Sequence, residues 1–253
     1  MGSIWVTGDI HGDPTRLNME AFQEQEEMSR DDFIIVLGDF GLVWDGSASE
    51  KYWLDWLEKK SFTVLFIDGN HENFDMLGEF PIVSFHGGKA HRIRGNIYHL
   101  MRGYVFQILG KKLFAFGGAS SHDIDDGILD PADFKDTRTL TRKAKAWRQA
   151  GKMFRIRGKS WWPEELPSKD EMQRGRQSLE AVGNAVDFVL THCAPGQVAA
   201  LVGYRESDRL TQYLDNLLLD GLEFTRWLFG HYHSNRQIMC KFLLLYEQIV
   251  RIA

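Results

Sequence analysis

Seven short apolar segments recur along the chain, and they constrain its fold more than any other feature. Each is rich in β-branched or aromatic residues and most stop at Gly, Asp or Asn, a pattern typical of buried β-strands. We expect strands at residues 4–7, 33–37, 64–67, 104–109, 113–116, 188–190 and 227–229. Leu109 and Gly110 lie between two of these runs and predict a hairpin turn.

Helical patterns alternate with the first strands. Residues 49–60 open on a serine able to cap a helix, and residues 207–218 and, more weakly, 169–182 repeat the pattern. A strand, a helix and a strand near the start predict parallel βαβ units, and the later hairpin predicts a mixed sheet. We expect a second sheet to pack on the first.

Residues 120–170 differ from the rest of the chain. They are rich in charge, are interrupted by Gly and Pro, and show no sustained period. We interpret them as a long excursion near the functional site, so that residues 1–253 form a single domain. Such excursions are usually functional or disordered, and the pair Trp161 and Trp162 favours an ordered one.

Composition excludes several classes of protein. The formal charge of −5 argues against a protein that coats nucleic acid by general electrostatics. A nuclease stays open, because bound cations reverse the local field. Two cysteines, Cys193 and Cys240, are too few for a disulfide framework, and we expect both to be buried thiols. No run is long enough for a membrane span and no targeting segment precedes the first strand, so we expect a cytoplasmic protein.

Polar motifs follow five of the predicted strands. Because ligands bind beyond the carboxyl ends of strands in α/β folds, five such clusters are expected to converge. The motifs are Gly8-Asp9-Ile10-His11-Gly12, Gly38-Asp39-Phe40-Gly41, Gly69-Asn70-His71-Glu72, Thr191-His192-Cys193 and Gly230-His231-Tyr232-His233.

The side chains in these motifs suit metal ions. Oxygen and imidazole donors without thiolate fit manganese, iron or zinc. Pairs two residues apart point to the same side of an extended segment. Seven donors exceed what one ion needs and suit two ions that share a carboxylate, while the glycines let the backbone turn tightly. The candidate ligands are Asp9, His11, Asp39, Asn70, His192, His231 and His233.

In order and spacing, these five motifs resemble those of the calcineurin-like metallophosphoesterase superfamily. The match runs from Asp9 to His233, which is nearly the whole chain. The resemblance implies an α-β-β-α sandwich of two mixed sheets flanked by helices. It also implies an enzyme that hydrolyses a phosphate ester by means of a hydroxide bridging two divalent metal ions, with manganese as the expected metal and iron or zinc as alternatives.

The resemblance also implies a role for each matching residue. Asp9, His11 and His233 would hold the first ion, Asn70, His192 and His231 the second, and Asp39 would bridge them. His71 matches the histidine that touches the phosphate and protonates the leaving oxygen. We expect Glu72 or Asp39 to favour that proton.

The chain departs from the protein phosphatases of the superfamily at one position. They continue Gly-Asp into Asp-Arg-Gly, whereas this chain has Phe40 and Gly41 after Asp39 and lacks that phosphate-gripping arginine. We expect Arg155 and Arg157 of the excursion as replacements, with His122 as a further candidate for substrate contact. The stretches at residues 117–123 and 160–165 resemble a pattern in bacterial and phage members whose substrate is not characterised.

Several functions stay open at this stage. The substrate is a small phosphorylated molecule, for which we favour a small diester or a nucleotide over a phosphomonoester, and a nucleic-acid end is not excluded. A second class of function is a metal-binding interaction module that kept the fold without turnover. We interpret His86, His91 and His99 as structural, and Asp13 as a helix cap.

Overall fold

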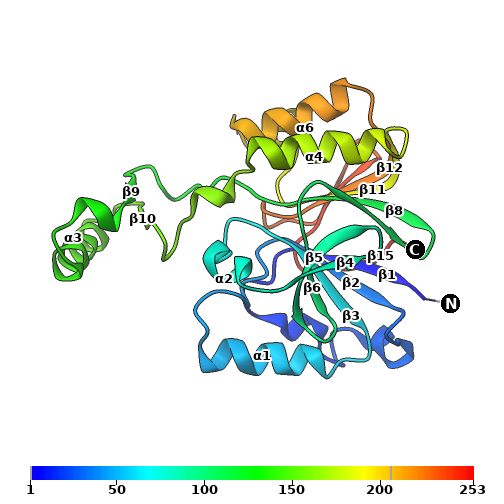
Figure 1. The fold of residues 1–253 in the computed structure, drawn as a ribbon, viewed down its shortest axis with the longest axis horizontal. Helices are drawn as coiled ribbons and strands as arrows, with labels where there is room; N and C mark the ends of the chain where they lie inside the picture. Colours follow the sequence, from blue (N-terminus) through cyan, green and yellow to red (C-terminus); the bar gives the residue numbers. More distant parts are fainter. Residues whose placement is uncertain (1, 206) are drawn as a thin grey trace.

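The computed structural model describes residues 2–205 and 207–253. Two mixed sheets pack face to face, and helices cover their outer sides (Figure 1). This arrangement confirms the predicted α-β-β-α sandwich. Within the described residues, no helix combines the length and the apolar character needed to cross a bilayer.

The larger sheet has seven strands in the order β15-β1-β2-β3-β6-β5-β4. The neighbours β1, β2, β3 and β6 run parallel, and the outer strands pair antiparallel. Its strands are β1 (Ile4–Thr7), β2 (Phe33–Leu37), β3 (Thr63–Ile67), β4 (Ile82–Phe85), β5 (Gly88–Arg94), β6 (Ile97–Leu100) and β15 (Ile249–Arg251).

The second sheet has six strands in the order β13-β14-β12-β11-β8-β7. Its central strands β8, β11, β12 and β14 are parallel, so their carboxyl ends share one edge. The strands are β7 (Tyr104–Ile108), β8 (Lys111–Phe116), β11 (Ala185–Thr191), β12 (Glu223–Phe229), β13 (Arg236–Ile238) and β14 (Phe242–Leu244).

Helices cover the outer face of each sheet. Helix α1 lies on the larger sheet, whereas α4 and α6 lie on the second (Figure 1). The helices of the body are α1 (Ala48–Glu58), α2 (Phe74–Gly78), α4 (Lys169–Glu180), α5 (Gly196–Leu201) and α6 (Arg209–Leu219), with 3-10 turns η1 (Pro14–Leu17), η2 (Gln23–Glu27) and η4 (Pro163–Glu165).

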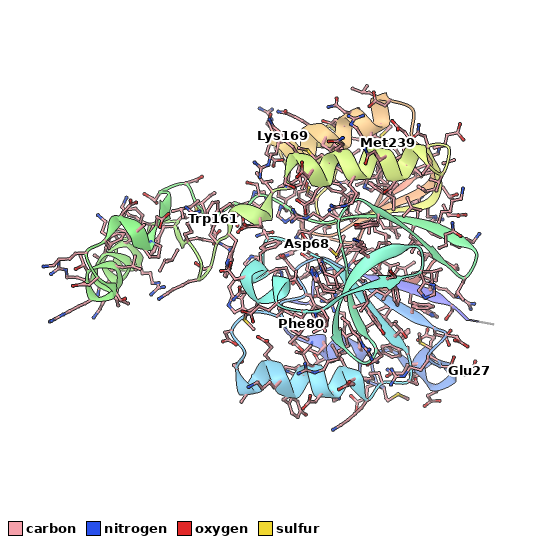
Figure 2. All side chains as sticks on the ribbon, viewed as in Figure 1. Glu27, Asp68, Phe80, Trp161, Lys169 and Met239 are labelled. Atoms are coloured by element: carbon pink, nitrogen blue, oxygen red, sulfur yellow. The ribbon has the colours of Figure 1, made fainter. Side chains whose placement is uncertain are left out.

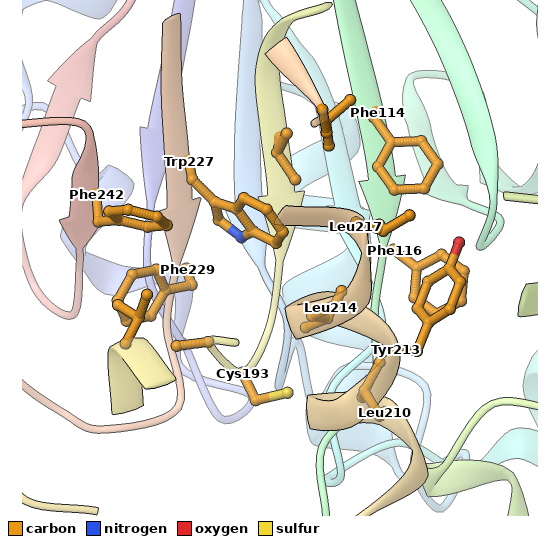
Figure 3. Close-up of a cluster of buried hydrophobic side chains, with 14 of the residues drawn as sticks. Phe114, Phe116, Cys193, Leu210, Tyr213, Leu214, Leu217, Trp227, Phe229 and Phe242 are labelled. Carbon is orange, nitrogen blue, oxygen red and sulfur yellow. The ribbon is translucent and has the colours of Figure 1, made fainter. Parts of the chain in front are cut away.

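Three apolar layers hold the body together. One lies between the sheets and includes Ile35, Leu65 and Leu190. A second lies between the larger sheet and α1. The third packs α6 against the second sheet around Trp227, and Figure 3 shows its aromatic and leucine side chains interdigitating. The layer between the two sheets fixes their relative position. The carboxyl ends of their central strands therefore meet at one place.

The seven expected strands are all present, but some expectations were wrong. Helix α1 begins at Ala48 and its cap is Ser47, and α6 is capped by Asp208. Cys240 is exposed, whereas Cys193 is buried as expected. Several strands were missed because they are only three or four residues long, too short to stand out as separate runs. Strands β4 and β14, for example, have four and three residues.

Most of the excursion protrudes from the body on the side opposite the two chain ends (Figure 1). We call residues 123–161 the arm. It contains β9 (Ile128–Leu129), η3 (Pro131–Asp133), α3 (Thr137–Gln149) and β10 (Arg155–Ile156), around a small cluster of Leu129, Leu140, Ala144 and Ile156. The helix was missed because so few of its residues are apolar.

Trp162 anchors the arm at its junction with the body. The side chain is buried, and its Nε1 donates to Asp75 Oδ2 at 2.8 Å. Its ring also packs edge-on against Trp44, with ring centres 5.4 Å apart. Figure 2 shows the neighbouring Trp161 at this junction. Trp162 therefore links the excursion to Trp44 and to Asp75 of α2.

Candidate metal centre

The predicted ligands converge where the two sheets meet. Asp9, Asp39 and Asn70 follow the adjacent parallel strands β1, β2 and β3. His192 and His231 follow the adjacent parallel strands β11 and β12. Two bonds tie the sheets here, since His231 N donates to Asp9 Oδ1 at 3.0 Å and His192 Nδ1 lies 2.7 Å from Leu37 O.

One half of the cluster is formed by Asp9, His11 and His233. Their ligand atoms lie within 4.8 Å of one another. His233 Nε2 is 3.2 Å from Asp9 Oδ2 and 3.0 Å from His11 Nε2. Two imidazole nitrogens and one carboxylate oxygen that point at a common place form a donor set for a divalent cation.

The other half centres on Asp39 and His192. His192 Nε2 lies 3.3 Å from Asp39 Oδ1, and His11 Nδ1 lies 3.8 Å from Asp39 Oδ2. The two carboxylate oxygens of Asp39 therefore face different halves of the cluster. The ring of His231 lies 4.9 Å from that of His192, centre to centre. The position of Asp39 between the two halves is the one expected of a carboxylate that bridges two ions.

Buried negative charge gives the cluster its affinity for cations. Asp9 and Asp39 are almost fully buried. Burial alone would lower the pKa of His192, yet Asp39 and Asp9 overcome it and raise that pKa to about 10. Although burial also opposes ionisation of Asp39, His192 holds the pKa of that carboxyl well below its usual range. The pair of carboxylates thus attracts positive charge strongly.

Two buried atoms support cation binding directly. Asn70 Oδ1 has no hydrogen-bond partner among the described residues, and His192 Nε2 makes no hydrogen bond there although it faces Asp39 Oδ1 at 3.3 Å. Leaving a buried polar atom without a partner costs about 1–3 kcal/mol. Both atoms belong to the predicted set of ligands, and a cation in contact with them would satisfy both. The residues present therefore fit two divalent ions.

The backbone of the cluster is strained. His11, Asp39, His231 and His233 have φ values of 45°, 45°, 69° and 45°, a region that residues with a side chain rarely adopt. Each such residue costs of order ~1–3 kcal/mol and persists where function requires it. Four of the seven predicted ligands share this conformation, which aims their side chains inward.

Glycines beside the ligands are needed for space. A Cβ atom on Gly69 would lie 2.0 Å from Asp39 Oδ1, and one on Gly230 would lie 2.1 Å from Asp9 Oδ1. Neither glycine has a positive φ. For these two glycines the reason is steric, because any side chain would displace a carboxylate. Gly12, Gly38 and Gly41 have φ values of 77°, 93° and 65°, as expected for tight turns beside the ligands.

His71 lies beside the cluster and contacts an arginine of the arm. Its backbone N donates to Asp39 Oδ1 at 2.7 Å, and Arg155 Nη2 donates to its Nε2 at 3.0 Å. Burial lowers the pKa of His71 to about 4, an effect that Asp39 opposes and Arg155 reinforces. Asp39 favours the proton on His71 as expected, but burial has the larger effect on the pKa.

Glu72 does not act on His71. It accepts a hydrogen bond from Phe40 N at 2.7 Å, and burial raises its pKa well above the usual value. Its carboxyl group instead supports the loop that carries Asp39. Its role is therefore structural.

The arm residues behave differently from one another. Arg155 has a side chain only 8% exposed, pairs with Asp123 at 2.6 Å and reaches His71. Arg157 is 53% exposed and pairs with Asp130 at 2.8 Å, away from the cluster. His122 Nε2 lies 2.6 Å from His231 Nε2, with stacked rings. The structure thus brings Arg155 and His122 to the cluster and leaves Arg157 outside it.

A hydrogen-bond chain orients Asn70, and its members were not recognised as site residues. Asn70 Nδ2 donates to Ser121 Oγ at 3.4 Å, and Ser121 Oγ donates to Glu165 Oε2 at 2.7 Å. Burial raises the pKa of Glu165 to about 8. The chain holds the amide so that Oδ1 carries no protein partner. The two stretches set apart at residues 117–123 and 160–165 meet here.

Arg16 and Tyr246 support the first half of the cluster. Arg16 Nη2 donates to Asp9 O at 2.8 Å, and its Nη1 donates to Tyr246 O. The Tyr246 ring stacks on His233 with centres 4.6 Å apart. Asp13 accepts from Thr15 N and caps η1, as expected. A hollow of about 560 Å³ lies beside His11 and is bordered by these residues.

Comparison with known proteins agrees with this geometry. The model of the family described as calcineurin-like phosphoesterase matches residues 2–235. No curated protein matches the chain. The matched region contains every residue of the cluster as well as the arm.

Proposed function

We propose that this chain, which belongs to the calcineurin-like phosphoesterase family, hydrolyses a phosphodiester with two divalent cations bound at the candidate centre. The observation that carries the proposal is the buried atom Asn70 Oδ1, which has no hydrogen-bond partner, in a cluster where His192 Nε2 faces the buried carboxylate of Asp39 at 3.3 Å. Such an atom is costly unless a cation binds it.

The cluster divides naturally between the two cations. Asp9, His11 and His233 would hold one ion, and Asn70, His192 and His231 the other, with Asp39 shared. Manganese suits these oxygen and imidazole donors, and iron and zinc are the alternatives. When bound, the ions supply Lewis-acid charge for the phosphate oxygens and lower the pKa of a water molecule.

Arg155 takes the place of the arginine missing after Asp39. Its guanidinium is nearly buried and is held by Asp123 and by Ser160 O at 3.0 Å. A fixed guanidinium beside the cluster offers two N–H groups to a phosphate, which the fork geometry favours. In this structure it donates to His71 Nε2.

His71 is proposed to hand a proton to the leaving oxygen. Its low pKa, near 4, means that it accepts from Arg155 while no phosphate is bound. A phosphate that engages Arg155 would free Nε2, and the negative charge of the ester would favour a proton there. General acids of this kind contribute typically about 10²–10⁴-fold.

The first test compares two nitrophenyl esters. Protein stripped of metal and reloaded with manganese is expected to hydrolyse bis-p-nitrophenyl phosphate faster than p-nitrophenyl phosphate, with no turnover before reloading. Preference for the monoester would contradict the diester assignment. Two bound ions per chain without hydrolysis of either ester would favour a metal-binding interaction module, and failure to bind metal would overturn the proposal.

Arg155 and Arg157 form a matched pair for a second test. Arg155→Ala should lower kcat/KM by roughly 10–10²-fold, because a charge-assisted bond to phosphate contributes about 1.5–3 kcal/mol. Arg157→Ala removes the same charge outside the cluster and should leave kcat/KM within about twofold of the parent. Steady-state kinetics and melting temperatures of both variants check this, and equal effects would exclude Arg155 as the phosphate contact.

A further inference from the structure

The arm concentrates positive charge that the net charge of the chain conceals. The chain carries −5 overall, yet the arm contains ten lysines and arginines against six aspartates, and five of those aspartates precede residue 134. Helix α3 supplies half of these cations and has no acidic residue. A surface of this kind differs from the acidic balance of the rest of the molecule.

The cations of α3 are available to a partner. Three other cations of the arm are paired within it, since Lys152 pairs with Asp126, Arg155 with Asp123 and Arg157 with Asp130. In contrast, among the described residues none of the five cations of α3 forms an ion pair, and all are exposed. These five are Arg138, Arg142, Lys143, Lys145 and Arg148.

Three of the five cations form one stripe. Arg138, Arg142 and Lys145 are spaced by four and three residues, so they share one face of α3. Leu140 and Ala144 are buried in the cluster of the arm on the opposite face. The stripe therefore points away from the arm's own core. It spans about 10 Å of helix rise, comparable to the axial rise of about three phosphates in one strand of B-form DNA, at about 3.4 Å each.

The arm also connects this stripe to the candidate centre. Strand β10 begins at Arg155, whose guanidinium contacts His71. The arm extends from the body on the side away from both chain ends (Figure 1). A polymer with one ester bond at the metal centre can therefore continue along the arm. A small substrate bound at the centre would not reach the arm.

We propose that the arm is a docking surface for a nucleic-acid strand, and that the substrate of the centre is a phosphodiester within such a strand. The identity of the cleaved bond rests on the proposed function. The conclusion that the substrate is a polymer rests on the positive charge of α3. A membrane fits this helix less well, because its apolar residues Leu140 and Ala144 are already buried in the arm and it presents no apolar face to a bilayer.

Charge reversal on the stripe tests the docking surface. Fluorescence anisotropy measures binding of a fluorescein-labelled thymidylate oligonucleotide in EDTA, so that no cleavage occurs. R138E/R142E/K145E should weaken binding at least about tenfold and reduce the slope of log K against log salt by about 2, since three phosphate contacts are lost. The control K51E/K59E/K89E makes the same charge change at exposed lysines of the body and should bind within about twofold of the parent.

A second, milder variant guards against damage to the arm. R138Q/R142Q/K145Q keeps good helix formers. Its loss in log affinity for the oligonucleotide should be about half of that of R138E/R142E/K145E. Hydrolysis of bis-p-nitrophenyl phosphate should be unchanged in all three variants, because the small ester does not reach the arm. Parental protein that binds the oligonucleotide through the arm but cleaves no ester would refute the proposed function alone.

Two results would overturn the docking surface. One is oligonucleotide affinity that is equal in the stripe and control variants. The other is parental protein that binds phosphatidylserine vesicles but not the oligonucleotide. Either result, obtained with full activity on the small ester, would leave the proposed hydrolysis intact. It would exclude the arm as a docking surface for a nucleic-acid strand.

Discussion

Asp39→Asn is expected to reduce metal-dependent hydrolysis about 10³-fold or more and to lower the number of bound cations below two per chain. Asp39 Oδ1 lies 3.3 Å from His192 Nε2, and Oδ2 lies 3.8 Å from His11 Nδ1, so one carboxylate serves both halves of the cluster. Loss of about 4 kcal/mol of charge stabilisation corresponds to a factor near 10³. Metal content by mass spectrometry and kcat on the nitrophenyl diester measure the two effects.

Asn is the informative replacement because it keeps the shape of the side chain. Its Oδ1 can still accept from His71 N, as Asp39 does at 2.7 Å. Asp13→Asn is the control, since Asp13 caps η1 near the cluster and Asn caps equally well. Full activity and two bound cations in Asp39→Asn would exclude the bridging role.

His71→Ala separates loss of chemistry from loss of metal. If His71 is the proton donor, the variant should still bind two cations while kcat falls about 10²-fold. The fall should be larger for an ester with an alkyl leaving group than for one with nitrophenol. His71 also lies close enough to His11 and Asp39 to belong to a metal set. If His71→Ala loses a cation, His71 is a ligand and the proton donor is another group.

Arg102→Ala is expected to cost about 3–5 kcal/mol of unfolding free energy, which is a large part of the typical total of about 5–15 kcal/mol. Arg102 and Asp68 are 4% and 1% exposed. Arg102 Nε donates to Asp68 Oδ2 at 2.7 Å, and Nη2 donates to Glu164 O at 2.8 Å. Alanine would leave Asp68 charged and buried, and would detach β6 from the base of the arm.

An exposed arginine provides the matched control. Arg176 pairs with Asp220 at 2.5 Å on the surface, where both side chains are largely exposed. Arg176→Ala should therefore cost less than about 1 kcal/mol. Urea unfolding of both variants measures the difference. A cost for Arg102→Ala that is no greater than the cost for Arg176→Ala would contradict the assignment of Asp68 and Arg102 as a buried ion pair.

The cost of Arg102→Ala should depend on pH. Burial opposes ionisation of Asp68, but Arg102 and His99 hold its pKa well below the usual range. A carboxyl group with a lowered folded pKa stabilises the protein above its unfolded pKa of about 3.9, and this contribution is lost as pH falls. The difference in unfolding free energy between the parent and Arg102→Ala should therefore be largest near neutral pH and should become smaller below about pH 4. A constant difference would exclude Asp68 as its source.

The sequence by itself determined the seven strands that are apolar runs and the order of the motifs, and it predicted the ligand set. Buried strands such as β2 and β3 are apolar runs, and each polar motif follows its strand directly, so local pattern was sufficient. Element ends were less certain, because neighbouring residues cap equally well, as with Ser47 in place of Ser49. Strand β4 escaped detection because it has only four residues.

Only the tertiary structure decided which distant groups act on the cluster. Arg155 and Arg157 are only two residues apart in sequence, yet Arg155 reaches His71 whereas Arg157 pairs with Asp130. Likewise, Ser121 and Glu165 orient Asn70 across 51 and 95 residues of chain. The protonation of His71 also depends on burial, which no local pattern contains. Long-range pairing and desolvation are properties of the folded chain, and for that reason the sequence predicted the ligands but not the groups that tune them.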